Sequence, residues 1–136
     1  NIVSSKGKIN SIIVENAYAD AVDLDFSNLK IKKIIIKNSG NDCLDVSGGT
    51  YEVVSSSLEL CKDKAISVGE KSFFQINNVN INDAAIGISA KDFSTVILNN
   101  GKIKNAKVCV EAAQKKQEFG GGLARLNKII CESCIM

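Results

Sequence analysis

The amino-acid sequence predicts an all-β protein, a single-stranded right-handed parallel β-helix (a solenoid) of about six coils with roughly 22 residues each. Three observations support this prediction. Apolar residues recur at a nearly constant step, aromatic residues make up only 5% of the chain, and short turns rich in Asn and Gly separate the apolar segments. With 136 residues and 45% hydrophobic content, residues 1–136 are expected to form one domain around one core.

The first expected strand of each coil has an apolar residue, an outward residue and a second apolar residue. These segments lie at residues 22–24, 44–46, 66–68, 86–88 and 108–110, at steps of 22, 22, 20 and 22 residues. Period-two alternation predicts that the apolar members face the interior. A coil that returns to the same place one strand spacing further along an axis, about 4.8 Å, stacks these residues directly over one another.

Two further apolar ladders predict the other strands of each coil. One ladder contains Val14, Ile36, Leu58, Ile81 and Ile103, and the other contains Ile9, Ile31, Val53, Ile76, Ile97 and Phe119. An antiparallel sandwich also has short strands at regular spacing, but it does not require the same class of residue at each 22-residue step. The ladders therefore favour the solenoid.

The turns between the strands are expected to be corners. Asn tolerates a left-handed backbone and can bond its own main chain, so the Asn-rich and Gly-rich segments suit sharp changes of direction. Asn16 and Asn38 are 22 residues apart, and we expect their side-chain amides to stack.

The last coil departs from the pattern. Residues 111–122 are longer and more charged than the equivalent earlier turns and end in three glycines, which predicts a projecting loop. The sequence opens at Asn1 without an initiator methionine, so we expect a fragment or module of a longer chain. Open ends of a solenoid expose strand edges, which favours further coils in the native chain or end-to-end self-association.

Composition limits the functional classes. The net charge of +2 is too balanced for binding a phosphate backbone by charge alone, so we expect no nucleic-acid partner. No apolar run is long enough to predict a membrane span. The chain has no histidine, which excludes a histidine-dependent enzyme.

The five cysteines do not predict a disulfide framework. Their number is odd, and the apolar content is high enough for a core without covalent links, so buried or idle thiols are expected. The Cys131-x-x-Cys134 motif has no second pair of Cys or His ligands at the spacing of a structural zinc site. On the sequence alone it is a weak signal for metal or redox chemistry.

Acidic residues are predicted to gather on the first strands of two adjacent coils. The members are Asp20, Asp23, Asp42 and Asp45, with Lys64 on the next coil. Carboxylates stacked about 5 Å apart raise one another's pKa unless a cation compensates. One interpretation is a solvated acidic strip that lysines partly neutralise. The other is a Ca²⁺ or acid–base site facing an uncharged or anionic glycan, with Asp23 and Asp45 as contacts for the substrate and as metal ligands.

The motifs around these aspartates resemble those of polygalacturonase-type glycosidases. Tyr18-Ala19-Asp20, Gly40-Asn41-Asp42-Cys43 and Asp63-Lys64-Ala65-Ile66-Ser67-Val68-Gly69 are similar to that family's Asn-Thr-Asp, Gly-Asp-Asp-Cys and Gly-His-Gly-Ile-Ser-Ile-Gly. The resemblance covers residues 16–70 and implies the pectate-lyase-like β-helix superfamily, whose members mostly cleave, epimerise or bind polysaccharides. It assigns Asp20 and Asp42 to two of three catalytic aspartates. Asn41 replaces the third, and Lys64 replaces the family's histidine.

The C-terminal part carries the positive charge. Residues 1–99 have a net charge of −2 and residues 100–136 a net charge of +4. Lys115 and Lys116, in the expected loop, are candidate contacts for an acidic polysaccharide. The alternative is that the lysines protect the end of the solenoid against strand addition.

Three functions remain open on the sequence. The first is a carbohydrate-interacting module, without hydrolase activity, of a bacterial polysaccharide-processing or cell-envelope protein, which favours secretion or the cell envelope as its location. The second is a Ca²⁺-dependent uronate lyase or epimerase, with Asp20, Asp42 and Lys64 as catalytic residues and Lys64 as the base. The third is a structural or adhesive spacer whose rigid stack presents the loop over residues 111–122.

Overall fold

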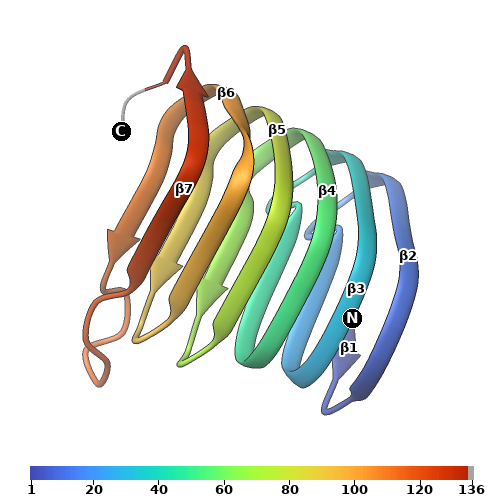
Figure 1. The fold of residues 1–136 in the computed structure, drawn as a ribbon, viewed down its shortest axis with the longest axis vertical. Helices are drawn as coiled ribbons and strands as arrows, with labels where there is room; N and C mark the ends of the chain where they lie inside the picture. Colours follow the sequence, from blue (N-terminus) through green and yellow to red (C-terminus); the bar gives the residue numbers. More distant parts are fainter. Residues whose placement is uncertain (135–136) are drawn as a thin grey trace.

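The computed structural model describes residues 1–134, which form a parallel β-solenoid of about five turns (Figure 1). This confirms the predicted fold class, with one turn fewer than expected. The strands are β1 (Ile2–Val3), β2 (Lys6–Ala17), β3 (Val22–Ser39), β4 (Leu44–Gly69), β5 (Phe73–Lys91), β6 (Thr95–Ala113) and β7 (Leu123–Glu132). Because residues 1–134 contain no helix, none of them forms a helical membrane span.

All strand pairs are parallel, and from β3 onward each strand stacks on the next. The order is β1-β3-β4-β5-β6-β7, and β2 also pairs with β3. Figure 1 shows the stack running from β2, in blue, to β7, in red. The long strands are not straight, because each bends round the corners of its coil.

The corners depend on residues with a left-handed backbone. Asn16, Asn38, Leu60, Asp83 and Asn105 occupy one corner on successive coils, with φ between 55° and 69°. The predicted amide stack is confirmed, because Asn38 Nδ2 donates to Asn16 Oδ1 at 2.8 Å. Asn is favoured at such positions because its short polar side chain tolerates this backbone region.

The core follows the predicted ladders closely. Val14, Ile36, Leu58, Ile81 and Ile103 are in register, and Cys131 continues their column on β7. The other ladder is correct as far as Ile76 and then continues through Leu98 and Leu126. Ile97 and Phe119 were therefore wrongly assigned to it. The loop over residues 114–122 lengthens the last coil, and Phe119 lies in that loop.

The predicted register of the first strands is wrong at one step. Ile66 pairs with Ile88 rather than Ile86, so the step is 22 residues and not 20. The cause is a bulge on β4 between Cys61 and Lys64, where two residues on β5 span what three span on β4. As a result, Ile86 pairs with Lys64, and Cys109 points into the core, where it is fully buried.

The expectation of idle thiols is also wrong for four of the five cysteines. Cys43 and Cys61 form one disulfide and Cys109 and Cys134 another, while Cys131 is free. The sequence did not show these pairs because residues 18 and 25 positions apart meet only through the winding of the coils.

Candidate functional site

Asp20 and Asp42 act as caps for the polypeptide backbone of the following coil. Asp20 Oδ1 accepts hydrogen bonds from Asp42 N, at 2.9 Å, and from Asn41 Nδ2, at 2.7 Å. Asp42 Oδ1 accepts one from Lys64 N at 2.9 Å. The three residues predicted to be catalytic therefore lie together on adjacent coils, and their contacts satisfy backbone groups that the corner would leave unpaired.

Lys64 is held between two carboxylates. Its Nζ lies 2.5 Å from Asp63 Oδ2 and 3.8 Å from Asp42 Oδ1. Burial alone would lower the pKa of Lys64, but the hydrogen bond to Asp63 and the charge of Asp42 outweigh it and raise that pKa above the ordinary value. A lysine that holds its proton this firmly is a poor general base at neutral pH.

Asp23 and Asp45 are direct neighbours in the β3–β4 register. Partial burial raises the pKa of Asp23, and the charges of Asp25, Asp45 and Asp20 raise it further. Burial likewise raises the pKa of Asp42. Within residues 1–134, no group of three closely spaced ligand atoms includes any of these carboxylates. The geometry thus gives two adjacent aspartates rather than a converged set of Ca²⁺ ligands.

Beyond Asp45, the outward column differs from the expected one. The corrected register continues it through Ser67, Ser89 and Glu111, in place of Gly87 and Cys109. Ser89 Oγ donates to Glu111 Oε1 at 2.7 Å, whereas Ser67 Oγ is buried and has no hydrogen-bond partner among the described residues. We use the name acidic face for Asp20, Asp23, Asp42, Asp45, Lys64 and Glu111 together with the buried Ser67 and Ser89 of the same columns.

Lys91 borders the acidic face and was missed in the sequence because the register there was wrong. Its side chain lies against Gly69 of the preceding coil. Burial lowers the pKa of Lys91; Asp45 opposes this effect, and the charges of Lys115 and Lys64 add to it. Lys91 is thus a partly buried cation at the edge of the acidic face.

Lys115 and Lys116 lie in the loop that follows β6, as predicted, although Glu111–Ala113 still belong to the strand. Asp92 Oδ1 accepts both backbone N–H groups, at 2.7 and 2.9 Å. The Lys116 ammonium pairs with Glu70. The loop is therefore anchored to the coil below, and of the two side chains only that of Lys115 is exposed and without an ion pair.

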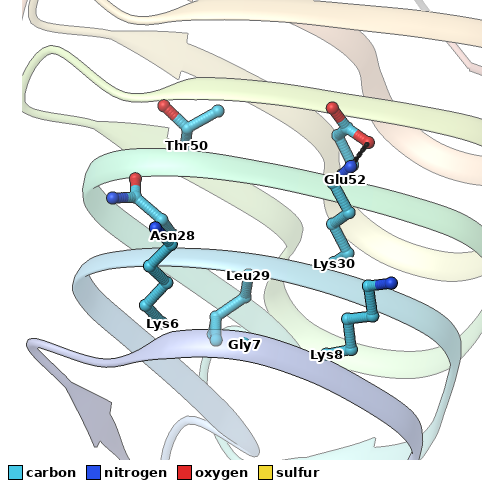
Figure 2. A pocket seen from close by; sticks show the side chains of 8 residues that line it. All are labelled: Lys6, Gly7, Lys8, Asn28, Leu29, Lys30, Thr50 and Glu52. Carbon is cyan, nitrogen blue, oxygen red and sulfur yellow. Dashed lines mark ion pairs between the residues drawn. The ribbon is translucent and has the colours of Figure 1, made fainter.

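A second surface carries uncompensated positive charge. A hollow of about 430 Å³ is lined by Lys6, Gly7, Lys8, Asn28, Leu29, Lys30, Thr50 and Glu52 (Figure 2). A second hollow shares Lys8 and Lys30 with it, and a third shares Asn10 and Lys32 with the second. The two add Asn10, Lys32, Lys33, Ser55, Gln75 and Asn77 among others. We call this continuous surface, which spans the first four coils, the lysine groove.

The charges in the lysine groove are poorly balanced. Lys30 Nζ lies 3.8 Å from Glu52 Oε2, and Figure 2 marks this pair. Of the other four lysines, none forms an ion pair within residues 1–134. Lys8 and Lys30 are direct neighbours in the β2–β3 register, an arrangement of like charges that costs stability unless an anion lies between them.

The lysine groove was missed because its lysines are dispersed in the sequence among acidic residues. Residues 1–99 have a net negative charge, which concealed the cluster. The step of 22 residues between Lys8 and Lys30 was the signal that could have revealed it.

Comparisons with protein-family models, with curated proteins and with solved structures found no match to this chain. The likeness to the polygalacturonase-type glycosidases therefore rests on those short motifs alone.

Proposed function

We propose that this protein binds an acidic polysaccharide in the lysine groove without cleaving it. The observation that carries the proposal is the set of five lysines, Lys6, Lys8, Lys30, Lys32 and Lys33, around joined hollows that contain one acidic residue, Glu52. An anionic ligand would relieve the repulsion between Lys8 and Lys30 and would gain several ion pairs at once.

The shape of the lysine groove suits a linear polymer. Its hollows follow one another along the strand direction, since the first two share Lys8 and Lys30 and the second and third share Asn10 and Lys32. Alternate outward residues on one strand are about 6.6 Å apart, and adjacent coils are about 4.8 Å apart. The cations thus form two parallel rows, along which a chain with regularly spaced carboxylates could lie.

The lining favours a glycan over a nucleic acid. None of the lining residues is aromatic, so bases have no ring on which to stack. Asn, Thr, Ser and Gln side chains offer hydrogen bonds to hydroxyl groups instead. The likeness of residues 16–70 to polygalacturonase-type motifs also favours a carbohydrate ligand.

The contacts of the acidic face support binding without catalysis. Asp20 and Asp42 cap backbone N–H groups, and Lys64 is protonated and paired. A uronate lyase or epimerase would need a free base at this place. The alternative hypothesis of a Ca²⁺-dependent lyase thus has less support than polysaccharide binding.

The test is calorimetric titration with polygalacturonate oligomers, with dextran as a neutral polymer and duplex DNA as a second polyanion. We expect binding of the uronate polymer, weakening with added salt, and none of dextran. The double variant Lys8→Gln/Lys30→Gln should bind about tenfold more weakly, because each exposed ion pair contributes up to about 1 kcal/mol.

The matched control is Lys104→Gln/Lys107→Gln, which removes two exposed charges elsewhere on the stack. It should change the affinity less than about twofold. Equal losses in both variants, or tighter binding of DNA than of polygalacturonate, would reject a glycan site in the lysine groove. No binding of any polymer by the folded protein would favour the spacer.

A further inference from the structure

The C-terminal end of the stack brings three cysteines together. Cys109 lies on β6, Cys131 on β7 and Cys134 just after β7, and their Sγ atoms all lie within 4.8 Å of one another. Among residues 1–134, this is the one group of three Cys, Asp or Glu ligand atoms at such spacing.

The winding of the coil creates this cluster. Cys131 stacks on Ile103 in register, in the inward column of the core. Cys109 is fully buried on the preceding coil, and the chain turns back at Ser133, with φ of 54°, to bring in Cys134. The Cys131-x-x-Cys134 motif, which has two ligands by itself, thus acquires a third from a residue 22 positions before Cys131.

We propose that these three sulfurs, when reduced, bind one thiophilic divalent cation of the Zn²⁺ class. Zinc–thiolate bonds are about 2.3 Å long, which places tetrahedral sulfur ligands about 3.8 Å apart. All three Sγ atoms already lie within 4.8 Å of one another, and reduction of the Cys109–Cys134 bond frees two of them to separate to this distance. The carbonyl oxygen of Ile103 lies 3.9 Å from both Cys109 Sγ and Cys134 Sγ. A fourth ligand would be such an oxygen or a water molecule.

The site is gated by oxidation, because the structure holds Cys109 and Cys134 as a disulfide. Two molecules of a small thiol reduce it, giving two cysteine thiols and one small-molecule disulfide. Metal binding then forms three metal–sulfur bonds and releases the three thiol protons, with no further transfer of electrons. The Cys43–Cys61 disulfide belongs to no such group of three, so it provides an internal comparison.

The test uses the whole chain, reduced with dithiothreitol and freed of it under anaerobic conditions. Titration with Cd²⁺, followed by the ultraviolet charge-transfer absorption of thiolate–Cd²⁺ bonds, should saturate at one equivalent, and Zn²⁺ should displace the Cd²⁺. The oxidised protein should bind neither ion. The test is independent of glycan binding, so its failure would leave the lysine groove proposal intact.

Variants identify the ligands. Cys131→Ser and Cys134→Ser should each weaken Cd²⁺ binding by more than the roughly 10- to 100-fold typical for loss of an outer-shell partner. The control Cys43→Ser/Cys61→Ser should still bind one equivalent, and it removes no bond that the reduced wild-type protein retains. Absence of the absorption band, or an unchanged titration in Cys131→Ser, would overturn the proposal. Circular dichroism confirms folding of each variant, and the two partly exposed positions decide the outcome if Cys109→Ser does not fold.

Discussion

Within β3 and β4, the acidic face and the lysine groove lie on either side of the corner at Phe26 and Gly48, yet most of their charged groups have different surroundings. On the acidic face, carboxylates accept backbone hydrogen bonds and Lys64 is paired twice. In the lysine groove, like charges face each other and Lys30 alone has an acidic partner.

The difference shows that charge density alone is a poor guide to a binding site. Asp20, Asp42 and Lys64, whose groups already satisfy one another, contribute to folding and have little left for a ligand, whereas Asp23 and Asp45 on the same face remain adjacent like charges. A cluster that the fold leaves unbalanced costs stability, and a ligand of opposite charge can recover that cost.

The largest change in stability is expected from Asp42→Ala. The variant removes the acceptor for Lys64 N and the buried partner of its ammonium, and we expect the free energy of unfolding to fall by about 2–3 kcal/mol. Urea denaturation measures the change. Asp45→Ala, on the same face but without such a bond, should change it by less than about 0.5 kcal/mol. An Asp42→Ala variant of unchanged stability would mean that the residue is not structural and would reopen its catalytic assignment.

A smaller, pH-dependent change in stability is expected from Asp23→Asn. Burial and nearby carboxylates raise the pKa of Asp23 above its reference value of 3.8, so the folded state holds this proton more tightly than the unfolded chain does. Ionisation therefore lowers stability as the pH rises through the interval between 3.8 and the raised pKa. At pH 7 the variant should be more stable than the wild-type protein by about 0.5 kcal/mol, allowing for solvent screening, and near pH 3.5 the two should be equal. A gain that persists at the acidic end would assign the effect to something other than charge.

The smallest effect is expected from Lys8→Gln alone. Removing one of two stacked lysines should raise the free energy of unfolding by about 0.2–0.3 kcal/mol at low salt, and about 0.5 M NaCl should abolish the gain. Thermal unfolding at the two salt concentrations measures it. Destabilisation instead would show that Lys8 supports the fold through its aliphatic stem.

The sequence was a sufficient guide to the fold because the core obeys a simple rule. Each inward column needs an apolar residue at every coil, so the 22-residue spacing of Val14, Ile36 and Leu58 predicts their register. The rule failed where coils have unequal length. The bulge before Lys64 and the loop before β7 shift the register by amounts that alternation alone does not show, because several nearby apolar pairs fit a 20- or a 22-residue step equally well.

The candidate sites were harder to predict for the same reason. Asp20, Asp42 and Lys64 were placed together correctly, but their hydrogen bonds depend on which way each carboxylate turns at the corner. To predict the cysteine cluster, one must know that Cys109 faces inward, but the wrong register placed Cys109 in the outward column. Outward residues such as Lys8 and Lys30 obey no packing rule, so their alignment is visible only after the coils have been aligned through the core.

Each strand of this stack packs almost entirely on the strands directly before and after it. One more coil, inserted between two existing ones, would therefore find matching neighbours on both sides without disturbing the rest. Duplication of a single gene segment could thus add one coil and lengthen each face of the solenoid by one strand spacing.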